Sequence, residues 1–230
     1  MTTQKPKSAN TRNYQRELDR LLEQLADAPR LLLHSCCAPC SSYVLEYLRK
    51  YFAITVFYYN PNISMEAEYR RRVAEQKRLI DLFNQLPDSG HSNSVIEGDY
   101  EPDAFYAAAK GLERCPEGGE RCFACYELRL RRTAALAKTQ GQDYFATTLT
   151  ISPLKNAARL NEIGERLAQE YQISWLPSDF KKKDGYKRSI ALSAKYGLYR
   201  QNYCGCVYSQ AADVREMPQE AAAHGSGAVL

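Results

Sequence analysis

The stretch Arg30-Leu-Leu-Leu-His34, followed by Ser35-Cys-Cys-Ala-Pro-Cys40, decides the fold class. A short and wholly apolar run of this kind is typical of a strand that is buried on both faces. Ser41 or Ser42 can cap a helix directly after the cysteine loop, and the following Ile54–Tyr59 is rich in β-branched and aromatic residues, as strands are. The order strand, helix, strand predicts a parallel βαβ unit.

The α/β alternation continues outward from this unit. The sequence predicts further helices at Tyr14–Ala28, Met65–Asn84, Asp103–Leu112, Phe123–Gln140 and Asn156–Tyr171, and further strands at Ser94–Glu97, Tyr144–Ile151 and Ile173–Leu176. Such alternation predicts an α/β fold with a mostly parallel sheet flanked by helices. We expect one catalytic domain over residues 14–216, with flexible tails at 1–13 and 217–230.

Ligands of such a sheet bind beyond the carboxyl ends of its strands. The side chains expected at that edge are Cys36, Cys37, Thr150, Ser152 and Ser178.

The composition favours an intracellular protein. The 230 residues carry a formal net charge of +4, and no apolar run reaches the roughly 18 residues that span a bilayer. The N-terminus lacks the pattern of a secretory signal, so we expect a cytoplasmic protein without a membrane partner. A reducing compartment disfavours structural disulfides, so the eight cysteines are better explained as metal ligands or redox groups.

Seven cysteines fall in three groups, which are Cys36-Cys37-x-x-Cys40, Cys122-x-x-Cys125 and Cys204-x-Cys206. A C-x-x-C pair at the start of a helix lets two thiolates face one metal ion. The spacing of the two such pairs fits a four-cysteine zinc site and an iron–sulfur cluster about equally. The adjacent Cys36 and Cys37, the surplus of thiols and the presence of only three histidines favour the cluster.

The third group, Cys204-Gly205-Cys206, is different because one intervening residue lets the two sulfurs close a small strained ring. A strained disulfide is easily reduced, which suits a redox relay, although two further metal ligands remain an alternative. Cys115 stands alone and is expected to be a half-buried or exposed thiol. His34 ends an apolar strand and is expected to be a hydrogen-bonded structural histidine.

The densest basic run lies near the C-terminus and comprises Lys181, Lys182, Lys183, Lys187 and Arg188. At the rim of a crevice it would meet a phosphate backbone, and nearby tyrosines such as Tyr203 could stack on unpaired bases. A solvated surface and ordinary core packing are the alternatives.

Five ordered motifs together resemble the cobalamin-independent epoxyqueuosine reductases (QueH). They are His34-Ser-Cys-Cys-Ala-Pro-Cys40, Pro116-Glu-Gly-Gly-Glu-Arg-Cys-Phe-Ala-Cys-Tyr126, Thr147-Thr-Leu-Thr-Ile-Ser-Pro153, Ser178-Asp-Phe-Lys-Lys-Lys183 and Tyr199-Arg-Gln-Asn-Tyr-Cys-Gly-Cys206. The resemblance runs from about Leu31 to Ser209. It implies a fold related to the adenine-nucleotide α-hydrolase (Rossmann-like) group and the deoxygenation of epoxyqueuosine to queuosine at the wobble position of tRNA.

The resemblance also implies roles for individual residues. A 4Fe-4S cluster would be held by Cys36, Cys37, Cys122 and Cys125, and Cys204 with Cys206 would form a redox-active disulfide. Family members place a mononuclear iron beside the cluster, for which Cys40 or Asp179 could serve. The residues expected to bind substrate are Lys181, Lys182, Lys183, Tyr203 and Arg200.

The expected partners are tRNA that carries epoxyqueuosine and an unidentified electron donor. We hypothesise that the cysteine pair returns electrons to the cluster. Tyr203, Ser178 and Thr150 are all candidate proton donors.

Two rival functions are considered. A tRNA-thiolating enzyme of the same fold group would need a glycine-rich phosphate cradle, and the loop Ser35–Ser41 contains no glycine. A zinc-stabilised RNA-binding module would purify colourless with about one zinc ion per chain.

Overall fold

The computed structural model describes residues 12–87 and 91–209, so most of the expected tails, 1–13 and 217–230, lies outside the described residues. Within the described part, five strands form one parallel sheet in the order β3-β2-β1-β4-β5. In chain order these are β1 Arg30–His34, β2 Ala53–Tyr58, β3 Ser94–Glu97, β4 Tyr144–Thr147 and β5 Ser174–Trp175. The predicted α/β class with a parallel sheet is confirmed.

The central strand β1 divides the sheet, because the strands on one side of it precede those on the other in the chain. His34 at the carboxyl end of β1 is in register with Phe57 of β2 and with Thr147 of β4. After β3 the chain therefore crosses to the other side of β1 and adds β4 there. Ligands of such sheets bind at this kind of switch point, which here is flanked by the loops that follow β1 and β4.

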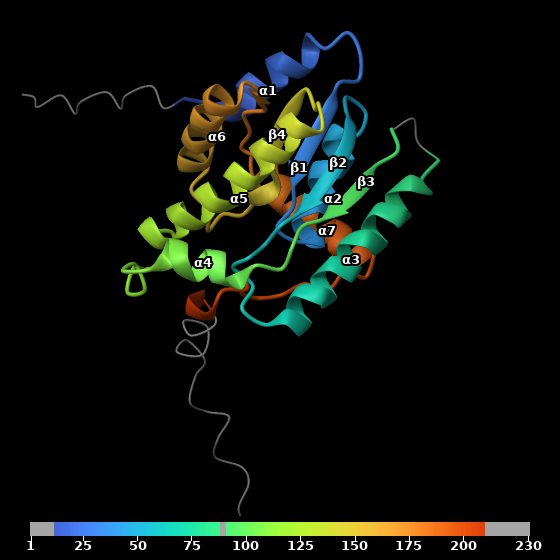
Figure 1. The fold of residues 1–230 in the computed structure, drawn as a ribbon. Coiled ribbons are helices and arrows are strands. Elements are labelled where there is room, and N and C mark those ends of the chain that lie inside the picture. The colour runs from blue at the N-terminus through green and yellow to red at the C-terminus, as the bar shows by residue number, and fades with distance from the viewer. Residues whose placement is uncertain (1–11, 88–90, 210–230) are drawn as a thin grey trace, which may run out of the picture.

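Helices cover both faces of the sheet (Figure 1). Those described are α1 Tyr14–Glu23, α2 Ala38–Leu48, α3 Glu66–Asn84, α4 Pro102–Ala109, α5 Glu120–Thr139, α6 Ala157–Tyr171 and α7 Gly185–Lys195. Leu31 and Leu33 pack with side chains of α1, α2 and α3, whereas Leu32 packs with side chains of α5 and α6. Because successive residues of a strand point to opposite faces, this run of three leucines builds both halves of the core.

The predicted elements are present, with shifted bounds and one addition. The expected strand over 144–151 ends at Thr147 and continues as a short 3-10 helix, Thr148–Ile151. The addition is α7, a helix after β5 that the sequence did not predict and that packs against α2. No helix in the described part of the chain has the length and apolarity needed to cross a membrane.

The start of α2 was predicted wrongly. Cys37, rather than Ser41 or Ser42, occupies the N-cap, and Pro39 lies in the first turn, where its fixed backbone angle suits a helix. Ser41 and Ser42 are buried inside the helix, and Ser42 Oγ donates to the carbonyl oxygen of Pro39 over 2.8 Å. The N-terminus of α2 therefore lies directly at the cysteines.

Candidate metal and redox site

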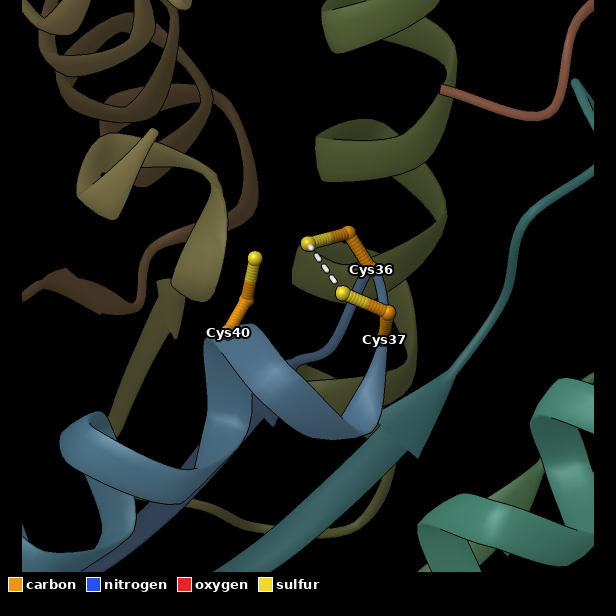
Figure 2. A group of neighbouring side chains, drawn as sticks. All are labelled: Cys36, Cys37 and Cys40. Carbon is orange, nitrogen blue, oxygen red and sulfur yellow. Dashed lines mark hydrogen bonds between the residues drawn. The ribbon is translucent and has the colours of Figure 1, made fainter. Parts of the chain in front are cut away.

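Three sulfur atoms meet at the N-terminus of α2. The Sγ atoms of Cys36, Cys37 and Cys40, which we call the sulfur triad, all lie within 4.8 Å of one another. Figure 2 shows the three side chains converging, with 3.9 Å between the sulfurs of Cys36 and Cys37. Three soft ligands in this arrangement can hold a thiophilic metal or one face of an iron–sulfur cluster.

Buried hydrogen bonds fix the loop that carries the triad. Ser35 Oγ lies 2.6 Å from Ser41 Oγ and donates to Gln76 Oε1 over 2.7 Å, while Asn60 Nδ2 donates to the Ser35 carbonyl oxygen over 2.9 Å. The backbone N–H of Cys36 donates to Thr148 Oγ1 over 3.2 Å. The loop is thus held by the segment after β2, by α3 and by the 3-10 helix after β4.

The thiols of the triad influence one another strongly. Hydrogen bonds from Cys37 and Cys40 lower the pKa of Cys36, and the positive charge of Arg129 acts in the same direction. Hydrogen bonding to Cys36 and burial raise the pKa of Cys37 to about 12, and Cys40 shifts upward for similar reasons. One thiolate therefore forms readily, whereas further ionisation requires a cation such as a metal.

A second pair of cysteines lies at the start of α5. Cys122 and Cys125 are not members of the triad's 4.8 Å group. The backbone N–H of Gly118 donates to Cys122 Sγ over 3.3 Å, as expected where a helix N-terminus offers free donors. Burial raises the pKa of both thiols, that of Cys125 to about 11.

The third group, which we call the Cys-Gly-Cys segment (Cys204–Cys206), lies beside the second. Figure 1 shows the chain after α7 passing the ends of α3 and α4. Cys206 packs with Cys125 and with Phe105 of α4, and Cys204 and Cys206 both act electrostatically on Cys122 and Cys125. Both cysteines of the segment are free thiols in this structure. Two cysteine groups that are distant in the sequence thus lie side by side.

Backbone contacts attach the Cys-Gly-Cys segment to the loop after β2. Ser64 N–H donates to the Gly205 carbonyl oxygen over 3.1 Å, and Asn62 Nδ2 donates to the Cys204 carbonyl oxygen over 3.4 Å. Arg72 of α3 donates to the same Cys204 oxygen over 3.2 Å. Gly205 has φ +112°, which L side chains rarely adopt, so the glycine between the cysteines is required by the backbone.

Three buried cations, which no sequence motif predicts, lie near the sulfurs. Arg72 pairs with Glu68 over 2.7 Å, and Lys155 pairs with Glu117 over 2.8 Å. Arg129 lies one helical turn after Cys125, with Nη1 3.8 Å from Cys125 Sγ. Only the spacing of four residues between Cys125 and Arg129 could have placed the two on one helix face.

The residues expected to bind tRNA are mostly engaged within the protein. Lys181 pairs with Asp179 over 2.5 Å, and Lys183 pairs with Asp19 of α1 over 2.7 Å. Lys182 is exposed and has no ion pair with a described residue.

The other candidates also have protein partners. The ring of Tyr203 lies 5.2 Å from the Arg72 guanidinium carbon, and exposed Arg200 donates to Ser193 Oγ over 3.4 Å. The hydroxyls of Thr150 and Ser178 are buried and lie 3.1 Å apart.

The surroundings of the cysteines fit a bound metal group. Four buried polar atoms near them lack a hydrogen-bond partner among the described residues: Tyr58 Oη, Asn62 Oδ1, Arg72 Nη2 and Tyr126 Oη. Buried polar groups are normally satisfied, so these atoms indicate that something polar completes the site. The donor set is dominated by sulfur, and both ring nitrogens of His34 already have polar partners, Nδ1 with Thr147 Oγ1 and Nε2 with Arg129 Nε. An iron–sulfur cluster or zinc matches this set.

Comparisons with known proteins agree with the geometry. The family model described as Epoxyqueuosine reductase QueH matches residues 31–212. The chain is 43% identical to an epoxyqueuosine reductase QueH of Staphylococcus epidermidis, over 92% of this chain and 91% of that protein. It is 42% identical to that of Streptococcus pyogenes serotype M1, covering 89% and 84% of the two chains, and 34% identical to that of Thermotoga maritima, covering 78% and 89%.

Proposed function

Because the chain belongs to the epoxyqueuosine reductase QueH family, we propose that it reduces epoxyqueuosine in tRNA to queuosine. The family match over residues 31–212, which includes all eight cysteines, is the observation that carries this function. The family assignment also argues against the rival tRNA-thiolating activity. Removal of the epoxide oxygen consumes two electrons and two protons, and it yields an alkene and water.

For the cofactor we propose a 4Fe-4S cluster held by Cys36, Cys37, Cys122 and Cys125. When bound, such a cluster supplies electrons one at a time. The convergence of Cys40 with Cys36 and Cys37 supports a metal-binding role for Cys40 as well, in the cluster or at an adjacent mononuclear iron. Asp179 is the weaker candidate for that iron because its carboxylate already pairs with Lys181.

For the redox pair we propose Cys204 and Cys206, which would cycle between a dithiol and a disulfide. The position of the Cys-Gly-Cys segment beside Cys122 and Cys125 supports electron transfer to the metal site from an external donor. The positive φ of Gly205 supports the tight turn that such a ring needs. The thiols would be oxidised and two electrons released, together with two protons.

For the substrate we propose that Lys182, Arg200 and Tyr203 contact tRNA. Lys182 and Arg200 are exposed and have no carboxylate partner among the described residues, which leaves their charge free for phosphates. Lys181 and Lys183 would contribute less, because Asp179 and Asp19 already neutralise them. A polyanionic tRNA substrate also accords with a cytoplasmic site of action.

The fold itself supports a relation to the adenine-nucleotide α-hydrolase group. The strand order 3-2-1-4-5 and the site at the switch point are shared by Rossmann-like folds in general. The loop after β1 differs from a phosphate cradle, because it presents cysteines where backbone N–H groups would approach a phosphate. We therefore propose that this fold group has here exchanged nucleotide binding for metal binding.

The deciding experiment is anaerobic purification followed by iron, sulfide and zinc analysis and by an assay of tRNA nucleosides. We expect a brown protein that converts epoxyqueuosine to queuosine when given a reductant. Replacing Cys36 or Cys122 by serine should remove iron and sulfide, because a hydroxyl is a poor ligand for iron in a cluster. A colourless protein with about one zinc ion per chain and no conversion would instead identify the zinc-stabilised RNA-binding module.

A further inference from the structure

Arg129 is a buried cation without an acidic partner. Its side chain is 1% exposed, and no carboxylate in the described part of the chain lies within ion-pair distance of it. Arg72, also buried, pairs with Glu68 over 2.7 Å. A buried charge is expensive unless an opposite charge compensates it. The position of Arg129 therefore requires a source of negative charge other than aspartate or glutamate.

The hydrogen-bond partners of Arg129 are neutral or are cysteines. Nη2 donates to Asn60 Oδ1, and Nε lies 3.3 Å from His34 Nε2. An imidazole is either neutral or positively charged, so His34 cannot supply the compensating negative charge. Nη1 points to Cys125 Sγ at 3.8 Å. The compensating negative charge must therefore come from the cysteine sulfurs or from a group that they hold.

Cysteines from three separate segments lie near this guanidinium. Nη1 is 3.8 Å from Cys125 Sγ, and Cys36 and Cys204 are close enough to interact with it electrostatically. Hydrogen bonds to Asn60 Oδ1 and His34 Nε2 hold the guanidinium of Arg129 in one orientation. Its positive charge therefore stays in place when the metal group is reduced.

We propose that Arg129 is a positioning residue whose fixed positive charge sets the electron affinity of the metal group held by the cysteines. The proposal rests on the cofactor assigned above. Each added electron makes an iron–sulfur group more negative, and a nearby cation in a water-poor site stabilises that state. Arg129 makes the group easier to reduce, and so allows an ordinary cellular donor to load it.

The test compares variants that separate charge from shape. Arg129→Gln removes the charge, whereas Arg129→Lys keeps the charge but cannot reproduce the guanidinium's fork of donors. Arg132→Gln is the matched control, because Arg132 lies on the same helix, is 54% exposed and forms its ion pair with exposed Asp99. The reduction potential of the anaerobically reconstituted protein is measured by a spectroscopic titration, which needs no tRNA and no turnover.

We expect Arg129→Gln to disfavour reduction at least tenfold, which is a potential about 59 mV lower for a one-electron couple. The reduction potentials of Arg129→Lys and Arg132→Gln should stay close to that of the unsubstituted protein. If the potential of Arg129→Lys falls as far as that of Arg129→Gln, the hydrogen bonds set the potential rather than the charge, and the proposal is wrong. An unchanged potential in Arg129→Gln overturns it equally.

A second variant keeps the arginine in place. Asn60→Asp puts a carboxylate against Nη2 with nearly the same shape, so it neutralises the guanidinium instead of deleting it. Asn60→Leu is its control, because both variants lose the hydrogen bond from Asn60 Nδ2 to the Ser35 carbonyl oxygen. Asn60→Asp should lower the potential in the same direction as Arg129→Gln and further than Asn60→Leu does, and it decides the matter if Arg129→Gln fails to fold. An unchanged potential in Asn60→Asp contradicts the proposal. If the unsubstituted protein takes up no cluster, the cofactor assignment fails first and this inference fails with it.

Discussion

Replacing Gly205 by alanine should release the Cys-Gly-Cys segment from its supporting loop. An L residue held at φ +112° carries about 1–3 kcal/mol of backbone strain. The added Cβ would lie 2.8 Å from Ile63 Cγ1 and 3.2 Å from Arg72 Nη1, and overpacking of this kind costs about 1–3 kcal/mol more. The sum is about 2–6 kcal/mol. Since about 1.4 kcal/mol is a factor of ten, the detached form of the segment should become at least roughly 30 times more populated.

Hydrogen exchange of the Ser64 amide measures this detachment, because Ser64 N–H donates to the Gly205 carbonyl oxygen. Alkylation of Cys204 and Cys206 in metal-free protein gives a second measure, and both rates should rise in Gly205→Ala. The control is Gly197→Ala, at φ +55° with no heavy atom within 4 Å of its added Cβ, which bears backbone strain alone. Unchanged Ser64 protection and unchanged alkylation in Gly205→Ala would refute this account of the segment.

Three further outcomes are expected. Cys115→Ser should retain iron, sulfide and activity, since the Cys115 thiol is in no described sulfur group; loss of iron would make it a ligand. Cys204→Ser should keep the visible absorption of the cluster. It should lose repeated turnover with a thiol donor, because one thiol cannot form the intramolecular disulfide. Loss of the absorption would instead show that Cys204 is a metal ligand. Lys182→Ala should lower the slope of log tRNA affinity against log salt concentration by roughly 0.7–0.9. Lys183→Ala should leave that slope unchanged, because Asp19 already neutralises Lys183. Equal slopes for the two variants would contradict this prediction.

Local pattern was sufficient for the sheet and for the first sulfur group. Leu31–Leu33 predicts a strand buried on both faces, and the structure places it at the centre of the sheet. The spacing of Cys37 and Cys40 predicts two thiols facing one point at a helix start, and both belong to the triad. These features depend on residues that are neighbours in the chain, so they can be read from the sequence.

Features that depend on distant residues were not predictable. The predicted start of α2 was wrong because the Ser41 hydroxyl hydrogen-bonds to Ser35 and Gln76 instead of capping the helix. Capping rules use only neighbouring residues, so they do not include such a contact. The burial of Arg129 depends on Asn60 and His34, which come from other segments. Likewise, Lys183 reads as a free cation in the sequence, yet it meets Asp19 more than 160 positions earlier.

The attachment of the Cys-Gly-Cys segment to the loop after β2 has a consequence for biosynthesis. A chain emerges from the ribosome from its N-terminus, so residues 36–125 are available long before residues 204–206. Until that last segment docks on Asn62 and Ser64, Cys122 and Cys125 lack their neighbours Cys204 and Cys206. The third cysteine group is therefore the last to be synthesised and the last to join the site.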